Sequence, residues 1–137
     1  MCGMQNVDTG KVTLSLEDNR YVLAVIYTSD EIEKEDVKPV TDYLDQFKEP
    51  IPILIERAGH YSISVMVQIV MLQQTKDRLK AAAFVERNNR DVLMTRIAAN
   101  TYFKDIEVRS FFNKQEAVAW LMENYATEPL LAESQPL

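Results

Sequence analysis

Hydrophobic and polar positions alternate at the start of the chain and then give way to a continuous apolar run. In residues 11–17 (KVTLSLE) the apolar side chains fall on one side, which predicts a half-buried strand at the edge of a sheet. The turn formers Asp18 and Asn19 separate it from the apolar run 21–27 (YVLAVIY). Together these segments predict a hairpin whose second strand is buried on both faces.

Helical spacing follows between residues 33 and 47. Apolar residues recur there at steps of three and four, at Val37, Val40, Leu44 and Phe47. We expect Asp36 to cap this helix, so that Pro39 falls in the first turn, where a proline's missing N–H matters least. The short apolar run 51–55 (IPILI) predicts the third strand.

Residues 61–75 fit two patterns. Ile63, Val65, Val67 and Ile69 alternate as in a strand, whereas Ile63, Met66, Val67 and Val70 fit one face of a helix. Length favours a helix, because strands usually run about 5–6 residues. A crossover between parallel strands also calls for a helix here. We therefore interpret the segment as a helix, with Ser62 as its cap.

The rest of the chain continues the alternation of strands and helices. Residues 80–85 and 107–112 predict strands, and a helix capped by Asn88 or Asn89 runs between them from Arg90 to about Lys104. Asn113 followed by Glu116 then opens a last helix, in which one face carries Ala117, Trp120 and Leu121. The order β-β-α-β-α-β-α-β-α predicts an α/β fold with a mixed, mostly parallel five-stranded sheet covered by about four helices.

The length of 137 residues predicts one domain. We place this domain at residues 11–125, between an N-terminal tail of residues 1–10 and a C-terminal tail of residues 126–137. In the second tail, Leu130 and Leu131 either pack on the core or a partner, or remain in a disordered segment.

Composition narrows the function classes. Fifteen basic and twenty-one acidic residues give a net charge of −6, which argues against a nucleic-acid-binding role. One cysteine (Cys2) and one histidine (His60) argue against a disulfide framework or a metal centre, and three glycines argue against a phosphate-binding loop. We therefore expect no cofactor and no metal. No secretory signal and no apolar stretch of about 20 residues is visible, which favours a cytoplasmic protein without a membrane span.

Ligands of open α/β sheets bind beyond the carboxyl ends of the strands. The first such segment, 28–36, holds five carboxylates but lacks calcium-loop spacing, so we interpret it as a helix start. The second contains ERAGHYSIS, in which His60 could act as a base on Ser62 or Ser64, with Glu56 or Glu86 orienting it. Because no oxyanion hole or nucleophile-elbow motif accompanies them, we expect no catalytic residues and no enzyme activity.

Charge is distributed unevenly along the chain. Residues 1–56 carry twelve acids and five bases (12 − 5, a net −7), whereas residues 57–137 carry nine acids and ten bases (10 − 9, a net +1). A locally basic stretch holds Arg87, Arg90 and Arg96. Nucleic acid, contacted with the help of Tyr102 or Phe103, is one reading of it. Solvated charges on a helix surface are the commoner explanation, and the binding alternative that we favour is an acidic protein partner or a second copy of this chain.

The last third of the chain carries a recognisable series of segments: AAAFVERN, NTYFKD and EVRSFFNKQEAVAWL. This series resembles the C-terminal half of SpoIIAA-like domains, also called STAS or STAS/SEC14-like domains. The closing E-A-x-x-W-L pattern of that family is matched by Glu116, Ala117, Trp120 and Leu121. The resemblance covers residues 11–125 and implies a non-enzymatic regulatory or protein-binding domain. Together with the missing catalytic residues and the uneven charge, it leads us to expect binding to a protein partner or to a second copy as a homodimer.

The resemblance also implies candidate site residues. The best-understood members are anti-sigma factor antagonists, switched by phosphorylation of a serine that opens the second helix in an Asp-Ser-Ser-Gly context. Ser62 and Ser64 lie near that position without the aspartate or the glycine. They form, with His60 and Tyr61, the candidate partner-binding or phospho-switch site. The SEC14-like side of the family implies an alternative, a carrier of a small apolar or lipid-like ligand, with a cavity lined by Met66, Val70 and Met71.

Overall fold

The computed structural model describes residues 6–101 and 105–130 of the chain. Its main sheet has six strands in the order β1-β2-β3-β5-β7-β8, and a separate two-stranded sheet pairs β4 with β6. The strands are β1 (Val7–Asp8), β2 (Val12–Glu17), β3 (Tyr21–Ile26), β4 (Glu31–Ile32), β5 (Ile51–Arg57), β6 (Ser62–Ile63), β7 (Leu79–Val85) and β8 (Glu107–Phe111).

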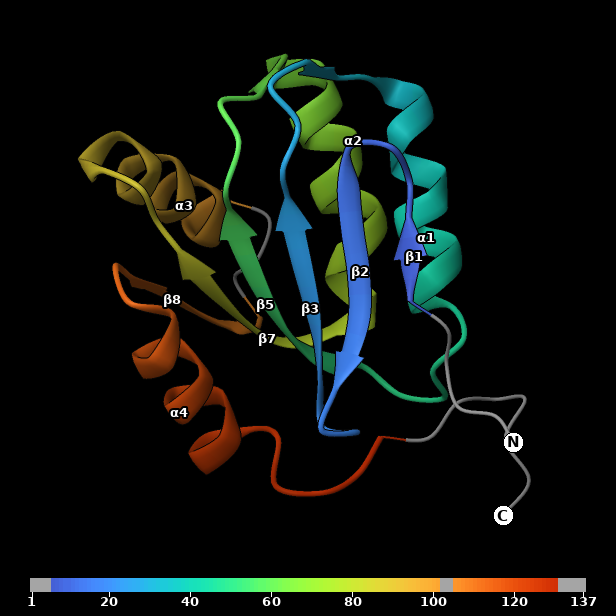
Figure 1. The fold of residues 1–137 in the computed structure, drawn as a ribbon, viewed down its shortest axis with the longest axis vertical. Coiled ribbons are helices and arrows are strands. Elements are labelled where there is room, and N and C mark those ends of the chain that lie inside the picture. Colours follow the sequence, from blue (N-terminus) through green and yellow to red (C-terminus); the bar gives the residue numbers. More distant parts are fainter. Residues whose placement is uncertain (1–5, 102–104, 131–137) are drawn as a thin grey trace.

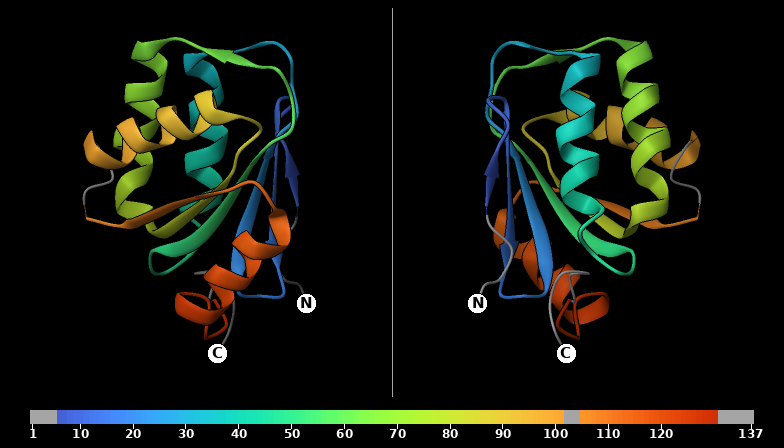
Figure 2. Two further views of the ribbon diagram at one scale, coloured as in Figure 1. Left: turned by 90° about the vertical axis from the view of Figure 1, so that its left-hand side faces the viewer. Right: turned by 90° about the vertical axis from the view of Figure 1, so that its right-hand side faces the viewer.

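In the described residues, four α-helices cover the two faces of the main sheet. They are α1 (Val37–Leu44), α2 (Val65–Thr75), α3 (Asn89–Thr101) and α4 (Lys114–Asn124), with short 3-10 turns η1 (Lys34–Asp36) and η2 (Lys76–Arg78). Figure 2 shows α1, α2 and α3 on one face and α4 on the other. The α/β class is as predicted, but the main sheet has six strands rather than five.

Because the extra strand β1 lies outside β2, the first hairpin is not at the edge of the sheet. Within the hairpin, β2 and β3 pair antiparallel, and Asp18 and Asn19 have φ angles of 52° and 55°, as a tight hairpin turn requires. From β3 onward all neighbouring strands of the main sheet are parallel. The expectation that β2 lies at the edge is wrong, because Val7 and Asp8, assigned to a tail, pair with Leu14 and Thr13.

The sheet separates two hydrophobic clusters. The larger one lies under α1, α2 and α3 and takes Val22 and Ala24 from β3, whereas the smaller one lies under α4 and takes Tyr21 and Leu23 from the same strand. This confirms that the second strand of the hairpin contributes to both faces. In α4, Ala117 and Leu121 are fully buried, as the shared helical face predicted.

The first predicted helix is divided in two. Residues 34–36 form the 3-10 turn η1, and the α-helix begins at Val37, with Pro39 in its first turn. Asp36 does not cap α1 through its side chain as expected. Its carboxylate instead accepts hydrogen bonds from the Glu33 backbone N–H at 2.7 Å and from Lys11 Nζ at 2.9 Å. Both donors lie before the helix, so they draw the carboxylate away from the helix N–H groups.

The segment 61–75 combines both patterns that its sequence allows. Ser62 and Ile63 form the short strand β6, which pairs in parallel with Glu31 and Ile32 of β4, and the helix begins only at Val65. Ser62 is therefore not the cap. Ser64 has extended backbone angles, and its Oγ accepts the Val67 N–H at 3.2 Å. The two other capping predictions are confirmed, since Asn88 accepts from the Asp91 N–H and Asn113 from the Glu116 N–H.

The segment after α4 contacts the hairpin. The Leu130 backbone N–H donates to the Asn19 carbonyl at 2.8 Å, and the Leu130 side chain packs against the larger hydrophobic cluster. Several residues named from the sequence lie outside the described residues: Cys2, Tyr102, Phe103, Lys104 and Leu131.

Candidate functional site

A polar cleft opens beyond the carboxyl ends of β5 and β7, where the sheet topology predicts ligand binding. The small β4–β6 sheet and the beginning of α2 lie at the same end of the molecule (Figure 1). The cleft has a volume of about 400 Å³. We call it the polar cleft, and its lining consists of His60, Tyr61, Ser62, Ile63, Arg87, Asn88, Arg90, Asp91 and Met94.

Behind the cleft lies a buried ion pair. The Arg57 guanidinium at the end of β5 pairs with the Glu86 carboxylate at the end of β7, and the side chains are 7% and 0% exposed. Arg57 also donates to Thr95 Oγ1 at 3.0 Å and stacks 4.9 Å from the Phe84 ring centre. The second oxygen of Glu86 accepts from Ser110 Oγ at 2.7 Å. A buried charge pair requires this full set of partners, because each unpaired group would lose its hydration without compensation.

A second ion pair forms the wall of the cleft. Arg87 donates from Nε and Nη2 to the two carboxylate oxygens of Asp91, at 2.8 and 3.0 Å. These hydrogen bonds hold the pKa of Asp91 below its ordinary value and raise the pKa of Arg87. The remaining Nη1 of Arg87 donates to the carbonyl of Gly59, which ties the start of α3 to the loop after β5.

Tyr61 links the two ion pairs. Its hydroxyl accepts a hydrogen bond from Arg57 Nε at 2.9 Å, and Arg87 lies 5.4 Å from the centre of its ring. Cation–ring contacts of this kind stabilise both groups. Tyr61 is therefore part of the wall of the cleft.

Gly59 is required for the shape of this region. A side chain at this position would collide with the main-chain oxygens of Tyr27 and Thr28. The Ala58 and Gly59 N–H groups both donate to the Ile26 carbonyl, at 3.0 and 2.9 Å. The loop after β5 thus lies directly against the end of β3, which brings His60 and Tyr61 to the cleft.

The structure brings three of the four candidate switch residues into the cleft. His60, Tyr61 and Ser62 line it, whereas Ser64 is exposed at the start of α2. The two glutamates considered as orienting acids for His60 have other partners. Glu86 pairs with Arg57 and Ser110, and Glu56 lies 3.7 Å from Lys114. In the described part of the chain, neither glutamate therefore contacts His60 as an orienting acid.

A second concavity, the α2–α3 groove, is apolar. It measures about 330 Å³ and is lined by Val65, Gln68, Ile69, Leu72, Met94, Ile97 and Ala98. The three residues expected to line a ligand cavity do not line this groove. Met66 is 68% exposed, whereas Met71 packs against the larger hydrophobic cluster and Val70 is half-buried.

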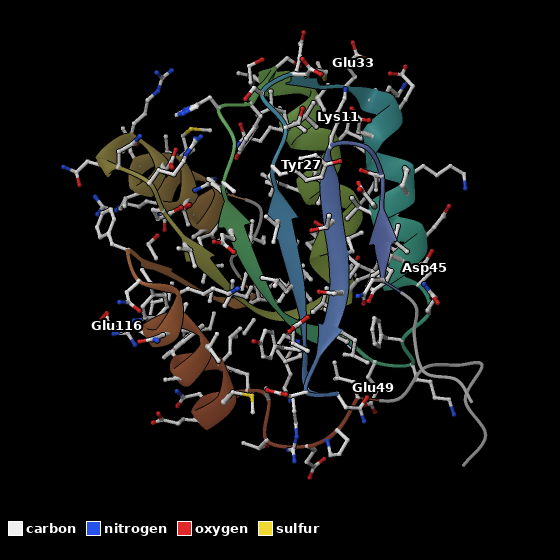
Figure 3. All side chains as sticks on the ribbon, viewed as in Figure 1. Lys11, Tyr27, Glu33, Asp45, Glu49 and Glu116 are labelled. Atoms are coloured by element: carbon white, nitrogen blue, oxygen red, sulfur yellow. The ribbon has the colours of Figure 1, made fainter. Side chains whose placement is uncertain are left out.

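The acidic segment 28–36 lies at the same end of the molecule, where Figure 3 labels Lys11, Tyr27 and Glu33. Lys11 Nζ lies 2.9 Å from Asp36 Oδ2, and this hydrogen bond raises the pKa of Lys11. Among residues 6–101 and 105–130, no three His, Cys, Asp or Glu side chains are grouped closely enough to hold a metal ion. Nor does any helix in these ranges have the length and apolar character needed to cross a membrane.

Sequence reasoning missed three buried residues at the cleft: Asp91 in its wall, and Arg57 and Thr95 behind it. One signal was present, because both charged residues lie just after apolar runs that predict strands: Glu86 directly follows the run 80–85, and Arg57 lies two residues after the run 51–55. When β5 and β7 pair in parallel with Glu56 opposite Val85, the next residues along, Arg57 and Glu86, become neighbours. That register is not contained in either run alone.

Comparisons with known proteins define the fold. A scan of the sequence against known protein families finds no match, and a search of curated proteins finds none. Among solved structures, the chain is similar to an uncharacterized protein of the DUF3478 family, with a SpoIIAA-like fold, from Shewanella loihica PV-4. The TM-score is 0.64 at 18% sequence identity, over 88% of this chain and 98% of the other. This chain therefore has a SpoIIAA-like α/β fold, as the resemblance of its last third to SpoIIAA-like domains predicted.

Proposed function

We propose that the chain is a non-enzymatic regulatory domain, located in the cytoplasm, that acts by self-association through α2. The observation that supports this is the composition and exposure of α2. Seven of its eleven residues are apolar and none is charged, yet Val65 and Met66 are 74% and 68% exposed. Apolar surface of this kind gains about 25 cal/mol for each Å² that a partner removes from water.

The absence of charge on α2 favours a second copy as the partner. Two copies of a chain with a net charge of −6 repel one another wherever acidic surfaces meet. The α2 helix is a place where two copies can approach without like charges facing each other. A two-fold arrangement uses the same patch on both molecules, so an uncharged apolar patch is complementary to itself.

Sedimentation velocity tests this proposal. We expect a dimer with a dissociation constant in the micromolar range, so that the dimer is the main species of the wild type at a protein concentration of about 100 µM. The variant Met66→Lys is expected to be monomeric, because two copies would then bring like charges into the contact. Gln115→Lys is the matched control, since it adds the same charge to an exposed position of α4, on the opposite face of the sheet. A monomeric wild type, or a dimer that survives Met66→Lys, would contradict the proposal.

A second candidate function is the binding of a small apolar ligand in the α2–α3 groove. Its volume of about 330 Å³ falls in the range of small-molecule sites. A fluorescent apolar probe titrated into the chain should then bind with one-to-one stoichiometry, and Gln68→Trp, which fills the groove, should abolish that binding. If Met66→Lys loses the dimer but binds the probe as the wild type does, the two functions are separate.

A further inference from the structure

We propose that the polar cleft binds the phosphate group of a phosphate monoester. Four of its lining side chains carry hydrogen-bond donor groups: Arg90, His60, Ser62 and Asn88. Within the ranges 6–101 and 105–130, the Arg90 guanidinium, the His60 ring, the Ser62 hydroxyl and the Asn88 amide nitrogen donate to no other group. This inference is independent of the proposed self-association, which uses α2.

The charges behind these donors cancel. Arg57 is neutralised by Glu86, and Arg87 by both oxygens of Asp91. The charge that remains on the lining is the cation of Arg90. The nearest acidic side chain along the β4–β6 pairing, Glu31 opposite Ser62, is exposed and does not line the cleft.

The number and type of donors favour phosphate over a carboxylate. A carboxylate offers two oxygens, whereas a phosphate monoester offers three terminal oxygens to donors from four side chains. Arginine is well suited to this ligand, because its planar guanidinium can donate two parallel hydrogen bonds to phosphate oxygens. Such charge-assisted bonds are about twice as strong as neutral ones.

The remaining walls leave room for the organic part of the ester. A volume of about 400 Å³ is within the usual range of small-molecule sites and exceeds what a bare phosphate needs. Ile63 and Met94 contribute apolar side chains and Tyr61 an aromatic ring. The ring is fixed by the hydrogen bond from Arg57, so less conformational freedom is lost when a ligand binds.

Calorimetric titration tests the site with two probes, inorganic phosphate and glycerol 3-phosphate, at constant ionic strength adjusted with chloride. We expect saturable one-to-one binding with a dissociation constant near or below about 1 mM. Arg90→Ala should weaken it about tenfold or more, because one charge-assisted contact of about 1.5 kcal/mol is lost. Arg96→Ala is the matched control, since Arg96 is an exposed arginine of the same helix that does not line the cleft. Its affinity should stay within about twofold of the wild type.

Co-sedimentation with vesicles distinguishes the source of the phosphate group. Binding to phosphatidic acid vesicles but not to phosphatidylcholine vesicles, lost in Arg90→Ala and without binding of glycerol 3-phosphate, would identify a lipid headgroup. Binding of glycerol 3-phosphate would identify a soluble ester. Absence of saturable binding in every arm, or equal loss in Arg90→Ala and Arg96→Ala, overturns the site. We expect the Met66→Lys variant to bind phosphate as the wild type does. That result would support the phosphate site whether or not the chain forms a dimer.

Discussion

The guanidinium of Arg57 lies against the carboxylate of Glu86 where β5 and β7 leave the main sheet, and both side chains are buried. Arg57 also reaches α3, because it donates to Thr95 Oγ1 at 3.0 Å and to the Asp91 carbonyl at 3.4 Å. One ion pair therefore joins two strands to the helix whose first turn forms a wall of the polar cleft.

Breaking this pair should destabilise the fold strongly. In Glu86→Gln the Arg57 guanidinium remains buried without a counter-charge, so we expect the free energy of unfolding to fall by about 3–5 kcal/mol. Urea denaturation followed by circular dichroism measures the loss. The double variant Arg57→Met/Glu86→Leu removes both charges and should recover most of it. A loss under about 1 kcal/mol in the single variant would show that water reaches the pair.

Asp91 should make the stability depend on acid. Hydrogen bonds from Arg87 lower the pKa of Asp91 in the folded state relative to the unfolded chain. The stabilisation is therefore fully present above the unfolded pKa of about 3.9 and is lost as the pH falls through the lower folded value. At pH 7, Asp91→Asn should cost about 1.5–3 kcal/mol, and the gap to the wild type should narrow below about pH 4. Unfolding curves between pH 7 and pH 3 give the comparison; a gap that stays constant throughout argues against this role.

The two serines near the start of α2 should behave differently. Ser64 caps the helix through the hydrogen bond from Val67, so Ser64→Ala should lower the free energy of unfolding by about 1 kcal/mol. Ser62 lies in β6 and caps no helix, so Ser62→Ala should change it by less than about 0.5 kcal/mol. Thermal denaturation of the two variants side by side decides between the positions; equal losses would mean that Ser64 does not act as the cap.

Tyr43 carries a cost that a substitution can remove. Its hydroxyl is buried in α1 and has no hydrogen-bond partner among the described residues, and burial raises the pKa of its phenol to about 12. Since a buried unpaired polar group costs about 1–3 kcal/mol, Tyr43→Phe should leave the stability unchanged or raise it by about 1 kcal/mol. The ring contact with Phe47, at 6.0 Å between centres, is preserved. A clear loss of stability in the urea midpoint would indicate a water-mediated partner for the hydroxyl.

The predicted elements and the observed ones agree where burial follows a regular period. The alternation in 11–17 indicates which side of a strand faces the core, and the apolar run in 21–27 indicates a strand buried on both sides. The strands β2 and β3 lie at these two segments. The caps at Asn88 and Asn113 were also predictable, because each acts on an N–H only three residues away. Short-range rules of this kind need no knowledge of the rest of the fold.

Predictions failed where a contact from a distant segment decides the local structure. Ser62 and Ile63 fit a helix by length, but their pairing with Glu31 and Ile32 makes them a strand. Asp36 fits a helix cap by its position, but Lys11, 25 residues earlier, binds its carboxylate and draws it away from the N–H groups of α1. The hydrophobic pattern around Ser62 or around Asp36 does not show which distant segment will contact it.

By itself, the sequence determined the α/β class, the order of the main elements and the resemblance to SpoIIAA-like domains, because periodicity and short-range caps reflect local burial. Only the tertiary structure decided the sixth strand, the small β4–β6 sheet and the polar cleft. The cleft lies at the end of the sheet where parallel pairing of β5 with β7 places Arg57 next to Glu86, 29 residues apart. Such a pairing depends on strand register, and register is a property of two segments together.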